Sequence, residues 1–190
     1  YLIYEIIVEG GLTRYMAIFK DQDTTKIGSI RSSRHYFLDY AMENDAIYVH
    51  WGWSPQAQSD ISKYNINNIN GLTWEGTYFY RDKSLKVSTE HTGFTTMEML
   101  KKGANRLGYR TTSTASPLLN YEVDEIDQTN LETIPANTIT IKYSSSITDE
   151  YVYDADNKVY KRYVNGKKHV DDITKKQYTF KNIITYQVAN

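Results

Sequence analysis

The chain has 190 residues, a formal net charge of −1 and no cysteine. That length fits one large domain or two small ones, and a hydrophobic fraction of 40% with only 3 prolines favours a compact fold over disorder. A charge so close to zero provides no field to hold nucleic acid by its phosphates, and the lack of cysteine excludes disulfides and thiolate zinc sites.

The N-terminus and the aromatic content add further expectations. No segment approaches the ~20 apolar residues of a membrane-spanning helix, and no secretion signal is visible. Because the chain opens directly on the strand-like run YLIYEIIVEGG, we expect residues upstream of it, including any targeting signal. The 18 tyrosines against 5 phenylalanines indicate many half-buried rings with hydrated hydroxyls.

Residues 1–115 have the element order of a mixed α/β region, in which about three helices pack on a sheet. The expected strands cover residues 1–8, 13–19, 27–30 and 46–51, followed by a polar loop at 65–71 and a strand or hairpin at 72–82. The expected helices cover 34–43, a segment from 55 onward and 95–107, with caps at Ser32 or Ser33, at Ser54 before Pro55, and at Thr95 or Thr96.

Residues 116–190 are expected to form a β-rich region, which makes the whole chain an α+β protein. The expected strands lie within 137–144, 149–172 and 181–188. Two hairpin turns divide the middle segment, one at 154–158 and one at Asn165-Gly166, a residue pair typical of a type I′ turn.

Several motifs of this chain are similar to those of a known family. They are IYEIIVEGGLTRYMAIF, IGSIRSSRHYFLDYAMENDAIYVHWGWSPQA, NGL, the RD of Arg81-Asp82, EHTGFTT, YDADNKVYKRYVNGKKHVDDIT and NIITY. With them, nearly the whole chain resembles the bacterial DUF3048 family. The resemblance implies an N-terminal α/β domain at 1–115 and a β-rich C-terminal domain at 116–190.

The same resemblance implies a location but no chemistry. It implies a lipoprotein of Gram-positive bacteria, held on the extracytoplasmic face of the cell membrane by an N-terminal lipid anchor that is absent from this chain. The family has no established activity, so no catalytic residue follows from it. One departure is WGWS, which stands after the YVH strand where the family usually has a glycine-rich stretch.

An anion-binding site is predicted at the RSSR motif. Arg31 and Arg34 flank Ser32 and Ser33 at an expected helix start, where guanidinium groups, hydroxyls and free backbone N–H groups can converge on a phosphate or carboxylate. Arg14 and Arg81 can join the same rim. The alternative is that one arginine pairs with an acid at a sheet end, such as Glu5 or Glu9, while the serines only cap the helix.

Two further groups of residues are candidates. Glu90 and His91 can act as acid and base, although neighbours on an extended strand point to opposite faces, and the alternative is a histidine that hydrogen-bonds a loop. His50, Trp51 and Trp53 follow a strand end, where they can line a sugar or lipid-headgroup cleft or form a buried aromatic cluster. If the strands ending at Arg31 and His50 are parallel, both segments open on one edge.

Metal and cofactor sites are not predicted. His35 and Asp39, four residues apart on a helix, are at most half of a metal site. The DADN turn lacks the central glycine and closing glutamate of an EF-hand. The sequence contains no P-loop, G-x-S-x-G or G-x-G-x-x-G motif.

Three functions therefore remain open, and whether the protein is an enzyme stays undecided. The first is a binding module for an anionic ligand of the cell envelope. The second is an envelope enzyme that transfers or hydrolyses a phosphorylated sugar or lipid, with arginines stabilising charge and His91, His50 or Glu90 moving protons. The third is a scaffold whose tyrosine-rich β region binds a protein partner.

Overall fold

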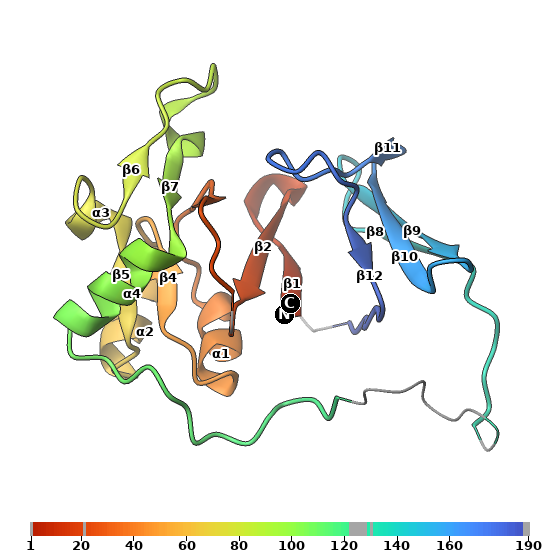
Figure 1. Ribbon diagram of the computed structural model, residues 1–190, viewed down its shortest axis with the longest axis horizontal. Helices are drawn as coiled ribbons and strands as arrows, with labels where there is room; N and C mark the ends of the chain where they lie inside the picture. The colour runs from red at the N-terminus through yellow and green to blue at the C-terminus, as the bar shows by residue number, and fades with distance from the viewer. Residues whose placement is uncertain (1, 21, 122–128, 130, 188–190) are drawn as a thin grey trace. The chain divides into compact units, whose positions relative to one another are not determined.

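The computed structural model places the chain in two compact units (Figure 1). The described residues are 2–20, 22–121, 129 and 131–187. Unit 1 is formed by Ala17–Tyr121, and unit 2 combines Ile3–Met16 with the described chain after Tyr121. The N-terminal hairpin therefore packs with the C-terminal strands, which come more than a hundred residues later. The mixture of helices and sheets confirms the α+β class, with a β-rich C-terminal region.

Unit 1 contains all the α-helices of the described chain. These are α1 (Tyr36–Glu43), α2 (Pro55–Lys63), α3 (Gly71–Trp74) and α4 (Met97–Arg106). Its strands are β3 (Ile27–Gly28), β4 (Tyr48–His50), β5 (Asn68–Asn70), β6 (Tyr80–Arg81) and β7 (Gly93–Thr95), and a short 3₁₀ turn, η2, covers Thr89–His91. Strands β4 and β5 are parallel, whereas β3, β7 and β6 form an antiparallel sheet in that order.

The predicted caps of the second and third helices are confirmed. The Ser54 hydroxyl accepts a hydrogen bond from the Ala57 N–H at 3.2 Å, and Pro55 is the first helical residue, where its missing N–H costs nothing. The Thr96 hydroxyl accepts from the Met99 N–H at 3.1 Å at the start of α4.

The segment 65–82 differs from its prediction. Strand β5 lies inside the expected polar loop, because its backbone pairs with β4 and its central Ile69 is buried in the core. Helix α3 then replaces the first part of the expected strand, which is reduced to β6. The asparagines on either side of Ile69 disguise this short strand in the sequence, since only one of its three residues is apolar.

The core of unit 1 is built around Trp51. Its indole packs edge-to-face on Phe79, with 5.4 Å between the ring centroids, and it contacts the backbone of two glycines. A Cβ atom at Gly71 or Gly93 would come within 2.4 Å or 2.6 Å of the indole. Both positions therefore require glycine because the tryptophan fills the space of a side chain.

Unit 2 consists of an antiparallel sheet and most of a hairpin, whose residues Ala17 and Ile18 group with unit 1. The hairpin is formed by β1 (Leu2–Ile7) and β2 (Thr13–Ile18), joined by the 3₁₀ turn η1 (Glu9–Gly11). The sheet contains β8 (Thr138–Lys142), β9 (Thr148–Asp154), β10 (Val159–Val164), β11 (Lys167–Lys168) and β12 (Thr179–Phe180). Its order is β11-β10-β9-β8, with β12 also paired to β10.

Both predicted turns of the C-terminal region are present. The turn between β9 and β10 covers 155–158, and Asn165 and Gly166 have φ angles of 50° and 73°, the pair of positive values that a type I′ turn needs. The last expected strand is wrong over residues 181–187, where the chain is irregular after β12. Residue 188 lies outside the described residues.

A buried arginine ties the hairpin to the sheet. Arg162 on β10 is 2% exposed and donates to both carboxylate oxygens of Glu5 on β1, at 3.0 and 2.8 Å. It also donates to the carboxylate of Asp149, which is fully buried, and its guanidinium contacts the His169 ring. We call these four residues the Arg162 cluster.

Two kinds of feature are absent from the described part of the chain. None of its helices combines the length and apolar character needed to cross a membrane. Within the same residues, no group of three or more histidine, aspartate or glutamate side chains is arranged to hold a metal ion.

Candidate functional site

Arg31 lies in a segment that is hydrogen-bonded on both sides. The Ile30 N–H donates to the Gly93 carbonyl at 2.8 Å, and the Arg31 carbonyl accepts from the Trp51 N–H at 2.9 Å. Two residues later, Ser33 and Trp53 form a parallel bridge. The two segments therefore run in the same direction, as expected for strands that open on one edge.

The predicted helix start at RSSR is wrong. Helix α1 begins only at Tyr36, and its N-cap residue makes no side-chain capping bond. The Ser32 hydroxyl donates to the Trp51 carbonyl at 3.0 Å, while Ser33 is buried and donates to the Arg34 carbonyl at 3.3 Å. Both hydroxyls donate to backbone carbonyls, and neither caps a helix start, because the bridge to the neighbouring segment continues past them.

The two arginines of the motif also have different contacts. Arg34 donates to the Ser33 carbonyl at 3.0 Å. The Arg31 side chain instead reaches the η2 turn, where it donates to Glu90 Oε2 at 3.0 Å and lies 2.6 Å from His91 Nδ1. Arg31 is thus the cation of a three-residue group with Glu90 and His91, which we call the Arg31 cluster.

The η2 turn explains how neighbouring residues reach one arginine. Because Thr89–His91 is a 3₁₀ turn and not an extended strand, Glu90 and His91 are not forced to opposite faces. His91 Nε2 lies 3.6 Å from Glu90 Oε1. Both side chains are accessible, with 62% of Glu90 and 49% of His91 exposed, whereas 24% of Arg31 is exposed.

Arg81 holds the turn in place. It donates from Nη1 to the Thr89 carbonyl at 2.7 Å and from Nε to Glu75 Oε1 at 3.1 Å. Its guanidinium carbon lies 4.3 Å from the centre of the Trp51 ring, in a cation–π contact. Arg81 therefore connects the buried core to the turn that presents Glu90 and His91 to Arg31.

His50 and Trp51 support the site from inside. The His50 ring is 1% exposed, with Nδ1 2.7 Å from the Gly52 carbonyl and Nε2 3.1 Å from Asn68 Oδ1. Burial lowers the pKa of His50, although both hydrogen bonds act in the opposite direction. His50 and Trp51 are both buried. For these two residues the structure agrees with the second alternative from the sequence, a buried aromatic cluster.

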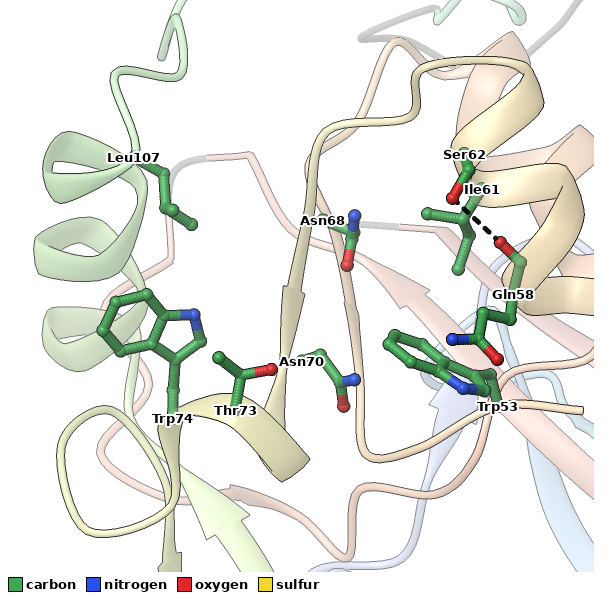
Figure 2. Close-up of a pocket in the computed structure, with 9 residues that line it drawn as sticks. All are labelled: Trp53, Gln58, Ile61, Ser62, Asn68, Asn70, Thr73, Trp74 and Leu107. Carbon is green, nitrogen blue, oxygen red and sulfur yellow. Dashed lines mark hydrogen bonds between the residues drawn. The ribbon is translucent and has the colours of Figure 1, made fainter.

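Trp53 is the aromatic residue of WGWS that lines a cavity. Figure 2 shows this pocket, which has a volume of about 220 Å³ and lies in unit 1. Its lining residues are Trp53, Gln58, Ile61, Ser62, Asn68, Asn70, Thr73, Trp74 and Leu107. Arg14, the remaining predicted site residue, lies on β2 and belongs to unit 2.

Sequence reasoning missed the polar residues of this pocket. Asn68 and Asn70 alternate with Ile69, and this period of two is a strand signal that a run rich in asparagine conceals. Gln58 and Ser62 are four residues apart on α2, so they share one helix face. The helix spacing of Gln58 and Ser62 is visible in the sequence, whereas the alternation of Asn68 and Asn70 becomes informative only once β5 is recognised as a strand.

The Arg31 cluster pairs a guanidinium group with a largely exposed carboxylate. A guanidinium group binds carboxylates and phosphates through paired N–H donors. Here the exposed Glu90 carboxylate accepts one of these bonds. An exposed ion pair of this kind contributes only ~0–1 kcal/mol.

Family models match both regions of the chain, and a known protein aligns with its full length. The family model described as protein of unknown function (DUF3048) N-terminal domain matches residues 1–110, and its C-terminal counterpart matches residues 139–190. A curated Bacillus subtilis (strain 168) protein named "Putative lipoprotein YerB" is 29% identical over 192 aligned residues, which cover 100% of this chain and 56% of the relative.

A solved structure agrees with the fold. The crystal structure of the YerB protein from Bacillus subtilis aligns with a TM-score of 0.79 at 29% identity, covering 93% of this chain and 58% of that one. The chain thus spans about half the length of the relative that it matches. These matches confirm the resemblance inferred from the sequence motifs.

Proposed function

The chain belongs to the DUF3048 family, and on that premise we propose that it is a binding module for a phosphate- or carboxylate-bearing ligand of the bacterial cell envelope. The observation that carries the proposal is the Arg31 cluster. Its arginine is fixed at the backbone on both sides, and among the described residues its guanidinium bonds to the exposed side chains of Glu90 and His91 alone.

The binding step is an exchange of one anion for another. The ligand anion takes the place of the Glu90 carboxylate on Arg31, and the neighbouring His91 ring can donate a further hydrogen bond. Glu90 can move away because 62% of its side chain is exposed. Arg81 keeps the turn in position during the exchange through its bond to Thr89.

The proposed location follows from the relative. The Bacillus subtilis protein is named a lipoprotein, and we propose for this chain the same kind of placement. An N-terminal lipid anchor outside the present sequence would hold it on the extracytoplasmic face of the cell membrane. There the site would meet lipid-linked and wall-linked phosphates or carboxylates.

Thermal unfolding with added anions tests the proposal. We would record melting temperatures with inorganic phosphate, pyrophosphate, glycerol phosphate and citrate at low ionic strength. A ligand at 100 times its dissociation constant adds about 2.7 kcal/mol to the stability of the native state. We expect Arg31→Met to abolish the shift and Glu90→Gln to strengthen binding by about fivefold, because a competing carboxylate is removed.

Arg110→Met is the matched control. Arg110 also pairs with a carboxylate on unit 1, that of Asp45, and it is more exposed than Arg31. It should keep the full response to each anion. Equal responses of the native protein and Arg31→Met would contradict the proposal, and no response to any of the four anions would favour the protein-interaction scaffold instead.

A transferase or hydrolase of phosphorylated sugars or lipids is the second candidate. It is favoured by the 3.6 Å approach of His91 Nε2 to Glu90 Oε1 beside a guanidinium. Release of phosphate from glucose 1-phosphate or from a lipid phosphate, lost in His91→Gln while anion binding persists, would establish turnover. His50 is buried and bonded through both ring nitrogens, so it is not part of this candidate.

A further inference from the structure

The pocket shown in Figure 2 contains a buried amide with an unused donor. Asn70 is 4% exposed, and its Oδ1 accepts from the Gly52 N–H at 2.9 Å and from the Leu72 N–H at 3.0 Å. These two bonds fix the orientation of the amide. Its Nδ2 has no hydrogen-bond partner among the described residues. A buried donor without a partner costs stability, so it calls for an explanation.

The lining of the pocket combines aromatic faces with uncharged polar groups. In Figure 2, the indoles of Trp53 and Trp74 lie on opposite sides of the pocket, with Thr73 and Asn70 between them. Gln58 adds an exposed amide from α2. None of the described residues that line the pocket carries a charge.

This composition selects a class of ligand. A charged ligand would be desolvated there without an opposite charge, which is costly. A purely apolar ligand would leave the Asn70 donor unpaired. A sugar ring has hydroxyl groups that accept and donate hydrogen bonds and C–H faces that pack on aromatic rings, so it satisfies both parts of the lining.

We propose that this pocket binds one neutral sugar ring, with the Asn70 amide donating to a ring hydroxyl and an indole packing on the ring face. The volume of about 220 Å³ is below the ~300–1,000 Å³ typical of pockets for drug-sized ligands, which fits a single ring. The proposal does not depend on anion binding at Arg31, because it uses none of the residues of the Arg31 cluster.

Tryptophan fluorescence provides a direct test. Two of the 3 tryptophans of the chain line the pocket, so ring binding should change their emission. We would titrate the protein with glucose, galactose and N-acetylglucosamine, and expect saturable quenching or a spectral shift with at least one of them. The same titration with Arg31→Met should give an unchanged dissociation constant.

Two variants test the assigned contacts. Asn70→Asp keeps an oxygen for the Gly52 and Leu72 N–H groups but replaces the donor with an acceptor, so binding should weaken about 10-fold or more. Gln58→Leu changes an exposed position and should weaken binding about 3- to 10-fold with an unchanged melting temperature. Gln56→Leu, on the same helix but outside the pocket, is the matched control.

The outcomes separate clearly. Saturable binding that Asn70→Asp and Gln58→Leu weaken and Gln56→Leu retains supports the proposal. The proposal is overturned if none of the three sugars changes the fluorescence up to about 100 mM, a concentration that would fill even a site with a millimolar dissociation constant. It is also overturned if binding is equal in Gln58→Leu and Gln56→Leu. Loss of sugar binding in Arg31→Met would overturn the independence of this pocket from the Arg31 cluster.

Discussion

The two units each contain an arginine that contacts a carboxylate and a histidine, but they place this trio in opposite environments. In unit 1, Arg31 contacts Glu90 and His91 at the surface. In unit 2, Arg162 and Asp149 are buried, and the Glu5 side chain is 9% exposed. His169 is half-buried, and Arg162 also donates to the Tyr15 hydroxyl at 2.8 Å. The residue types are the same, whereas the solvent that reaches them differs.

This difference determines what each trio can do. Water screens the pair of Arg31 and Glu90, so breaking it costs little, as the proposed anion exchange requires. Removing one partner of a buried pair leaves an uncompensated charge in a low-dielectric interior, which costs several kcal/mol. The Arg162 cluster therefore acts as a structural link between β1 and the sheet, whereas the Arg31 cluster is the site of the proposed anion exchange.

The largest predicted effect is that of removing the buried arginine. In Arg162→Met, the carboxylates of Glu5 and Asp149 remain buried without a cation, and we expect unit 2 to lose about 3–5 kcal/mol of stability. Far-UV circular dichroism in urea would measure the loss at pH 8, above the pKa of about 7 that burial gives Glu5.

Tryptophan fluorescence supplies an internal control for that experiment. All 3 tryptophans, Trp51, Trp53 and Trp74, belong to unit 1. Their unfolding transition should move by less than about 0.5 kcal/mol in Arg162→Met, because the substitution is in the other unit and the changes are expected to be independent. An unchanged circular dichroism midpoint would show that the Arg162 cluster is no more important for stability than the Arg31 cluster.

The next prediction concerns pH. Burial raises the pKa of Glu5 to about 7, with a further contribution from its hydrogen bond to Asp149, while the charge of Arg162 acts against the rise. The folded protein therefore keeps a proton that the unfolded chain releases above pH 4.5. Stability from this group is complete below about pH 4.5 and is lost as pH rises toward 7.

Neighbouring groups make a variant necessary for this test. Burial, and then the charge of Arg162, lower the pKa of His169, so its contribution to stability increases with pH and opposes that of Glu5. The hydrogen bond from Lys161 lowers the pKa of Asp154 to about 2, so the charge of Asp154 stays constant between pH 5 and 8. Urea midpoints of the native protein and Glu5→Gln, compared from pH 5 to 8, isolate Glu5. A constant difference between the two would refute the raised pKa.

The sequence predicted the local features of both units better than their long-range contacts. Ser54, Thr96 and the Asn165-Gly166 turn were identified because a cap or a tight turn depends on residues within three or four positions. The pairing of Glu5 with Arg162 joins residues 157 positions apart. No spacing rule identifies which distant charges meet, because that depends on how the sheets pack.

The same limit explains the errors at the candidate site. Arg31, Arg81, Glu90 and His91 were chosen by residue type, but the partner of Arg31 depended on a 3₁₀ turn that the sequence does not mark clearly. Ser33 has the residue type of a helix cap, yet its backbone bridges Trp53, so the pairing of segments overrode the local preference. Prediction from local residue preferences was wrong where the backbone pairs with a distant segment.

The smallest predicted effect tests whether the Arg31 cluster is truly exchangeable. Arg31→Met should change the stability of unit 1 by less than about 1 kcal/mol, because it removes an exposed pair and leaves Glu90 in water. Urea unfolding followed by tryptophan fluorescence would measure it. A loss as large as that of Arg162→Met would mean that Arg31 is needed to hold the η2 turn to the core. In that case a ligand could not take the place of Glu90 without unfolding the turn, and the anion-exchange step would fail on energetic grounds.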